Sequence, residues 1–128
     1  MNPLYQAAKQ VWGSRTLSPF VEAGSVAAAI QSGSGRIYTG VCIDTACALG
    51  MCAERSAIAA MITGGDSRID RLAVIMPDGA LGLPCGACRE LMMQLDGKDI
   101  QILTNLAPET YISLGQLMPQ WWSSLPEE

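Results

Sequence analysis

Apolar positions along the chain recur at two spacings, which predict alternating helices and strands. Residues 3–12, 52–65 and 85–95 are rich in helix formers or space their apolar side chains by three and four, which favours three helices. Shorter apolar runs favour five strands, at residues 25–32, 35–43, 71–77, 99–105 and 110–114. Helices that alternate with strands after an opening hairpin predict an α/β fold, a three-layer α/β/α sandwich around a mixed five-stranded sheet.

The composition adds limits on size and partners. With 128 residues, 49% of them apolar, the chain can close one core without cross-links, so residues 1–128 are expected to form a single domain. Eight basic residues against twelve acidic ones, without a long run of either, argue against a nucleic acid polymer as partner. The absence of a signal-like or membrane-length apolar segment leads us to expect a cytoplasmic protein that binds no membrane.

Cysteine and histidine usage narrows the chemistry further. The chain has five cysteines, an odd number that argues against a disulfide framework and favours reduced thiols or metal ligands. It has no histidine. Any bound metal must therefore be held by thiolates or carboxylates, and any general base must be something other than imidazole.

Two of the predicted helices begin with cysteine, Cys52 on one and Cys85 with Cys88 on the other. A helix N-terminus carries partial positive charge and free N–H groups, which favour the thiolate form that binds zinc. Three thiolates from two helix ends would leave one position of a tetrahedral Zn²⁺ open for water. That is the arrangement of a catalytic site, with one zinc ion per chain.

Charged residues stand beside these cysteines at helical spacing. Three thiolates make zinc a weaker Lewis acid, and Arg55 and Arg89 lie where hydrogen bonds to the sulfurs could offset that charge. Glu54 is displaced around the helix from Cys52, so it suits a proton carrier beside the open position better than a ligand. A Cys-Ala-Glu segment followed by Pro-Cys-x-x-Cys is a thiolate version of the zinc-deaminase signature.

On these motifs the sequence resembles the cytidine deaminase family, in particular its short, all-cysteine branch. The segments GRIYTG, ACALGMCAERSAI, PCGACRE and LGQLMPQWW stand in the family's order and at nearly its spacing. The resemblance implies hydrolysis of a cytosine-type nucleoside to the uracil form with release of ammonia, in a homotetramer. It also implies Cys52, Cys85 and Cys88 as zinc ligands, Glu54 as proton shuttle and Arg55 as charge neutraliser.

The substrate end of the site departs from the family pattern. The family's Asn-x-Glu, which holds the ribose hydroxyls, reads Cys42 and Asp44 here, and a thiol cannot replace an amide's paired donor and acceptor. The resemblance places Cys42, Asp44, Ala53 and Trp121 at the substrate. The stretches SVA and GRIYTGV are more similar to blasticidin S deaminase, so a cytosine-bearing antibiotic is the alternative substrate.

Other interpretations of the same cysteines stay open from the sequence. Cys-Gly-Ala-Cys at a helix start is also typical of a redox pair, although a redox pair requires neither Cys52 nor Glu54. Cys47, Cys52, Cys85 and Cys88 together would suit a closed structural zinc site in a non-catalytic protein, which would leave Glu54 and both arginines without a role. Asp44 could also cap the turn that follows it.

Overall fold

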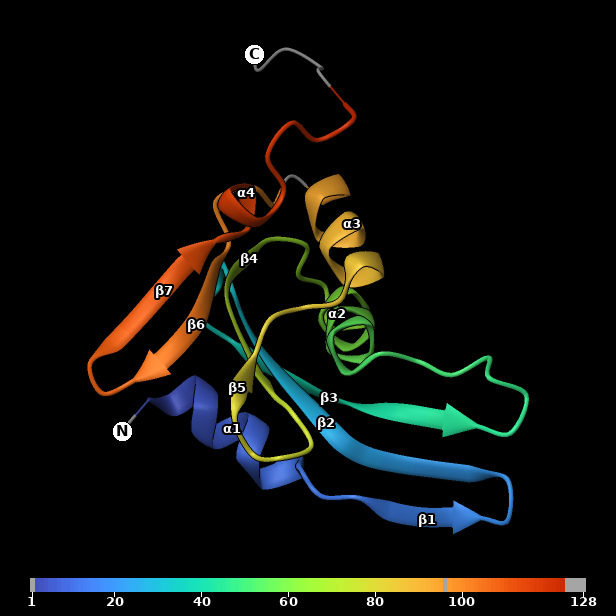
Figure 1. Ribbon diagram of the computed structural model, residues 1–128. Helices are drawn as coiled ribbons and strands as arrows, with labels where there is room; N and C mark the ends of the chain where they lie inside the picture. The colour runs from blue at the N-terminus through green and yellow to red at the C-terminus, as the bar shows by residue number, and fades with distance from the viewer. Residues whose placement is uncertain (1, 96, 124–128) are drawn as a thin grey trace.

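The fold is built on one mixed sheet of seven strands (Figure 1). The computed structural model describes residues 2–95 and 97–123. The strands are β1 (Arg15–Ser18), β2 (Val21–Ser32), β3 (Ile37–Thr45), β4 (Ile69–Ile75), β5 (Leu81–Gly82), β6 (Gln101–Leu106) and β7 (Glu109–Ser113).

The long strand β2 organises the sheet. One edge of β2 pairs with β3, and the other pairs with β1 near its start and with β4 along its second half. The sheet continues from β4 to β6 and β7, and only the β4–β6 pair is parallel. The five predicted strands are thus present, and the short strands β1 and β5 add to them, the latter between the predicted strand 71–77 and the predicted helix 85–95.

Helices cover both faces of the sheet (Figure 1). On one face α1 (Pro3–Val11) packs over alanines of β2 and β4, and on the other α2 (Ala53–Thr63) and α3 (Gly86–Gln94) cover a larger core. A short α4 (Leu114–Leu117), which the sequence analysis did not predict, follows β7. The three-layer α/β/α prediction is confirmed. The described helices are all too short to cross a membrane.

The sequence of α1 explains where that helix begins. Asn2 is the N-cap, and its side-chain oxygen accepts the backbone N–H groups of Leu4 and Tyr5 at 2.9 and 3.0 Å. Pro3 follows at the first helical position, where the missing N–H costs nothing. Leu4 and Ala8, one turn apart, then bury against the sheet.

Small residues let α2 approach the sheet closely at the place where the helix begins. A Cβ atom on Gly40 of β3 would overlap the backbone of Ala53 and Ala57, so only glycine fits there. Ala28 of β2, opposite Gly40 in the strand pairing, is fully buried beneath the same helix. This close contact fixes the position of the first turn of α2 relative to β3.

Candidate metal centre and active site

The starts of α2 and α3 carry the cysteines that the sequence pointed to. Cys52 is the N-cap of α2 and Cys85 is the N-cap of α3, and both have extended backbone angles. Neither side chain makes a capping hydrogen bond, so both sulfurs are available for other contacts. Cys88 lies one turn further along α3, on the side that is buried against the core.

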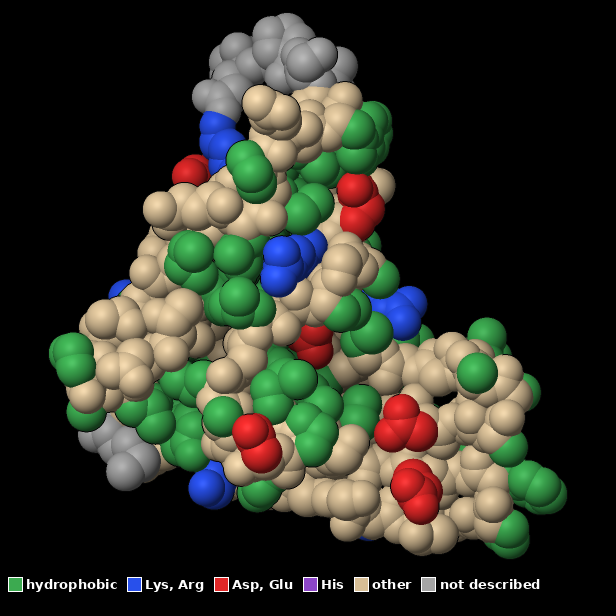
Figure 2. All heavy atoms as spheres, viewed as in Figure 1, with side chains coloured by type: hydrophobic (Ala, Val, Ile, Leu, Met, Phe, Trp, Pro, Cys, Tyr) green, Lys and Arg blue, Asp and Glu red, His purple; other side chains and the backbone are tan. Residues whose placement is uncertain are grey.

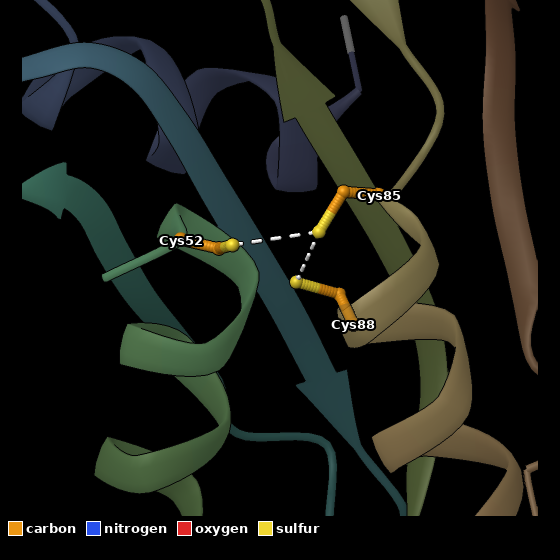
Figure 3. Close-up of side chains that lie close together, drawn as sticks. All are labelled: Cys52, Cys85 and Cys88. Atoms are coloured by element: carbon orange, nitrogen blue, oxygen red, sulfur yellow. Dashed lines mark hydrogen bonds between the residues drawn. The ribbon is translucent and has the colours of Figure 1, made fainter. Parts of the chain in front are cut away.

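The three thiols point toward one another from the two helices (Figure 3). The sulfur of Cys85 lies 3.4 Å from that of Cys52 and 3.1 Å from that of Cys88, and all three lie within 4.8 Å of one another. A tetrahedral zinc ion with bonds of about 2.3 Å holds its sulfurs about 3.8 Å apart, so the spacing suits zinc. The three residues fit one Zn²⁺ per chain.

The surroundings of the three sulfurs differ. Cys88 is fully buried, Cys52 is partly buried and Cys85 is exposed, so the cluster is open to solvent on one side. Burial, with the contact to Cys85, raises the pKa of the Cys88 thiol. Burial opposes ionisation of Cys85 too, but contacts with the thiol and backbone N–H of Cys88 lower the pKa of Cys85 below its usual range. A metal ion would favour the thiolate form of all three.

Glu54 places a carboxylate between the two helix starts. It is only 4% exposed, although it is a charged residue in the first turn of α2. Its Oε2 atom accepts the backbone N–H of Cys85 at 3.3 Å. A buried carboxylate that reaches across to the other cysteine-bearing helix is therefore held beside the thiol cluster.

The two arginines predicted to contact the sulfurs have different hydrogen-bond partners. Arg55 donates from a guanidinium nitrogen to the sulfur of Cys52 at 3.4 Å, and this contact raises the pKa of Arg55, which stays charged. Its Nε is buried and has no hydrogen-bond partner among the described residues. Arg89 donates from Nε to the carbonyl oxygen of Pro84 at 2.7 Å, and no described contact joins it to a sulfur. The predicted sulfur contact is therefore present for Arg55 and absent for Arg89.

The predicted substrate residues of β3 lie next to the start of α2. Ile43 and Met51 exchange two backbone hydrogen bonds of 2.9 Å, which places Cys42 alongside Cys52 in the antiparallel pairing. Cys42 is buried in the same core cluster as Ala53, the first residue of α2. Asp44, two residues further along β3, points to the same face of the strand and is exposed.

Ser25, which is not among the predicted substrate-binding residues, also lies in this region. The hydroxyl of Ser25 lies 3.2 Å from the sulfur of Cys42, and the backbone N–H of Val26 donates to that sulfur at 3.3 Å. Both come from a bulge in β2 that begins at Gly24, whose φ of +93° favours glycine. Gly24 stands just before the predicted strand 25–32, so the usual sequence signal of a bulge, a glycine inside a strand, appears only once β2 is seen to begin at Val21.

The remaining candidates lie away from the thiol cluster. Cys47 is exposed in the loop after β3, 3.4 Å from the hydroxyl of Thr45, and is not part of the described cluster of three thiols. Trp121 is partly buried and Trp122 is exposed, and both indole N–H groups donate to the Glu90 carboxylate of α3. A fourth thiol ligand is thus not supported by this arrangement.

Comparisons with known proteins agree with the geometry. Residues 6–104 match the family model for the cytidine and deoxycytidylate deaminase zinc-binding region. A cytidine deaminase from Mycobacterium tuberculosis is 30% identical over 107 residues, which cover 81% of this chain and 78% of that protein.

Solved structures show the same relationship. The crystal structure of cytidine deaminase from Mycobacterium leprae matches with 30% identity and a TM-score of 0.75, covering 91% of this chain and 95% of that chain. The cytidine deaminase from Burkholderia pseudomallei matches with 27% identity and a TM-score of 0.72, covering 94% of this chain and 98% of that chain.

A three-thiol cluster at two helix starts, with a buried glutamate beside it, defines a zinc-dependent hydrolytic deaminase. The chain belongs to the cytidine deaminase family. The predicted resemblance, fold class, enzyme class and zinc cofactor are therefore confirmed.

Proposed function

We propose that this protein hydrolyses the exocyclic amine of a cytosine-type nucleoside, cytidine or deoxycytidine, to give the uracil form and ammonia. The observation that carries the proposal is the position of Glu54. Its carboxylate is 4% exposed, accepts the backbone N–H of Cys85, and lies beside three thiols that suit zinc. A hydrolytic deaminase needs a proton carrier at this place.

Cys52, Cys85 and Cys88 are the proposed ligands of the zinc ion. When bound, the zinc ion would supply Lewis-acid activation of a water molecule as nucleophile. Glu54 takes the proton that the attacking water loses and passes it to the ring nitrogen next to the amine-bearing carbon. It then moves the second proton from the new hydroxyl to the departing amine, which leaves as ammonia, so that Glu54 ends in its starting state.

The proposed role of Arg55 is to offset thiolate charge. Its hydrogen bond to the sulfur of Cys52 draws negative charge away from the metal, which keeps the metal a stronger Lewis acid. Arg89 supports the site differently, because its bond to the carbonyl of Pro84 holds the segment that leads into Cys85. We therefore assign Arg89 a role in positioning the start of α3.

Asp44 and Ala53 are the proposed substrate-facing residues, and Cys42 lies largely buried between their elements. Ala53 offers backbone at the first turn of α2, and Asp44 offers an exposed carboxylate on the adjacent strand. A blasticidin S-type antibiotic is the second candidate substrate, because a thiol at position 42 cannot form the paired hydrogen bonds of an amide and this changes how the sugar is held.

We also propose a homotetramer in the cytoplasm. Support for assembly comes from large apolar side chains that are exposed on the surface, Leu49 (83%) and Trp122 (71%) among them. Trp121 packs against Trp122 with tilted rings, and Trp121 would reach a neighbouring subunit's site through this surface. The three clustered thiols must stay reduced to hold a metal, which a reducing compartment favours.

Ammonia release from a panel of compounds tests the proposal. The panel contains cytidine, deoxycytidine, free cytosine, blasticidin S and an aminopurine nucleoside, each incubated with protein of measured zinc content. We expect the highest kcat/KM for cytidine or deoxycytidine. Turnover of the aminopurine nucleoside alone would overturn the pyrimidine assignment, and turnover of blasticidin S alone would establish the second candidate.

A further inference from the structure

We propose that Ser25 is a specificity-determining residue that contacts the sugar of the substrate, and that Cys42 is a positioning residue that holds Ser25 in place. This inference rests on the proposed function, since it concerns the sugar end of a cytosine nucleoside. It assigns a contact to a residue of β2 and removes the direct contact expected of Cys42.

The hydrogen-bonding capacity of Cys42 is used inside the protein. Its sulfur accepts the backbone N–H of Val26 at 3.3 Å and lies 3.2 Å from the hydroxyl of Ser25. It also lies 3.8 Å from Oδ2 of Asp44, to which its S–H can donate. Cys42 is 8% exposed, so little of its side chain is left for a ligand. A thiol offers one weak donor and a weak acceptor, and both are occupied here.

The direction of these bonds leaves Ser25 with a free acceptor. A carboxylate can only accept, so the thiol proton is assigned to the bond with Asp44. The hydroxyl of Ser25 then donates to the sulfur, which leaves the oxygen lone pairs of Ser25 for another donor. Asp44 likewise presents an exposed carboxylate. Two acceptors on neighbouring strands suit the hydroxyl groups of a sugar.

The bulge that carries Ser25 is held on several sides, so the hydroxyl is well positioned. The backbone carbonyl of Ser25 accepts the indole N–H of Trp12 at 3.0 Å, and that of Gly24 accepts the backbone N–H of Gly13 at 2.8 Å. A Cβ atom on Gly24 would overlap the carbonyl of Gly13, so the bulge requires glycine. A group locked by its neighbours loses less entropy when it binds a ligand.

The location of the bulge suits the sugar end of the site. Cys42 lies alongside Cys52 across the Ile43–Met51 bridge, and Val26 packs on the same core cluster as Cys52. Asp44 stands directly opposite Glu22 in the β2–β3 pairing. Figure 2 shows acidic side chains on the surface over β2 and β3. Hydroxyl donors are therefore favoured at this end of the site.

A double-mutant cycle on zinc-loaded protein tests the inference. Ser25→Ala, Cys42→Ala and the double variant are assayed with cytidine and with free cytosine, and Ser67→Ala, in an exposed loop, is the matched control. We expect Ser25→Ala to raise KM for cytidine about tenfold, with kcat nearly unchanged and no effect on cytosine. Ser25→Thr, which keeps the hydroxyl, should restore most of the loss.

The double variant separates positioning from direct contact. If Cys42 acts through Ser25, the KM of the double variant for cytidine should equal that of Ser25→Ala alone. Two independent contacts would instead multiply the two single-variant increases in KM. Amide hydrogen exchange at Val26 provides a readout without substrate, and it should be faster in Cys42→Ala than in the wild type.

The possible failures are distinguishable. Unchanged KM and unchanged sugar preference in Ser25→Ala would overturn the role of Ser25, and multiplied effects or unchanged exchange at Val26 would overturn the role of Cys42. A wild-type protein that releases no ammonia from cytidine, deoxycytidine or cytosine would overturn the proposed function itself, and the sugar contact with it.

Discussion

The two ends of the site are built in different ways. At the metal end, Cys52, Cys85 and Cys88 stand in the first turns of two helices, and Glu54 is buried between them. At the proposed substrate end, Ser25 and the residues of β3 stand on a bulge and a paired strand, linked through the sulfur of Cys42.

This difference explains why one end matches the family pattern and the other departs from it. A zinc ion requires a fixed number of ligands at fixed distances, and helix starts supply both the geometry and the charge that thiolates need. Strand side chains that face a ligand can change without disturbing the backbone pairing of the sheet. Changes at the metal end should therefore affect zinc content and kcat, and changes at the substrate end should affect KM.

The largest effect is expected from loss of a thiol at the metal end. Cys88→Ser should leave the purified protein with almost no zinc and no measurable ammonia release, because the buried ligand is lost. Loss of bound metal also removes about 2.7 kcal/mol of stabilisation at a zinc concentration 100 times the dissociation constant. Metal analysis and thermal unfolding measure both changes.

Cys47→Ser is the control for that experiment, since Cys47 is exposed and outside the cluster. It should keep one zinc per chain and normal activity. A Cys47→Ser protein that loses zinc as Cys88→Ser does would instead indicate a closed site with four thiolates.

A smaller effect is expected from the arginine beside the cluster. Arg55→Gln should keep the zinc ion and lower kcat by about tenfold, because the thiolate charge at Cys52 is no longer offset. Arg55→Lys should retain part of the rate. Arg68→Gln, which alters an exposed pair with Asp70, is the control and should match the wild type. An unchanged kcat in Arg55→Gln would remove Arg55 from the mechanism.

A change at the substrate end should separate KM from kcat. Asp44→Asn should raise KM for cytidine by a few fold at unchanged kcat and zinc content, because a neutral amide binds a sugar hydroxyl less strongly than a carboxylate does. Asp78→Asn, at an exposed turn before β5, is the matched control. A fall in kcat without a change in KM would place Asp44 in the chemical step and contradict the separation of the two ends.

The smallest effect is expected far from the metal, beyond the last turn of α2. Hydroxyl groups of Tyr38, Ser34 and Ser32 donate to Asp66 and lower its pKa. A lowered folded pKa means that ionised Asp66 stabilises the fold above its ordinary pKa, and that this contribution is lost as the pH falls through the folded value.

Asp66→Asn should therefore lower the thermal midpoint by at most a few degrees at pH 7, and the difference from the wild type should shrink at acid pH. Asp70→Asn, in the exposed pair with Arg68, is the control. A difference that grows as the pH falls would contradict the assigned direction of the pKa shift.

The sequence alone was sufficient to predict the metal end. The helix formers of residues 52–65 and the Pro84 that precedes residues 85–95 locate the helix starts at Cys52 and Cys85, and helix ends favour thiolates. Glu54 followed from its spacing to Cys52. Both helix starts can be recognised from short stretches of sequence, and in the fold the starts of α2 and α3 lie side by side on the same face of the sheet.

Contacts that depend on tertiary pairing were not predictable in the same way. The contact of Ser25 with Cys42 depends on a bulge and a strand register that link residues 17 positions apart. Arg89 could equally reach a sulfur or a carbonyl by helical spacing, and the structure shows the carbonyl of Pro84. Short strands such as β1 and β5 carry too few residues for a periodic signal.

The most direct test of the central claim is ammonia release and zinc content measured together for Glu54→Gln. Because glutamine keeps the shape of the side chain but cannot carry the proton, we expect one zinc per chain, an unchanged fold and a kcat lower by about 10²- to 10⁴-fold. Full turnover of cytidine by Glu54→Gln, or loss of the zinc ion with the carboxylate, would contradict the role of Glu54 as proton carrier beside a three-thiolate site.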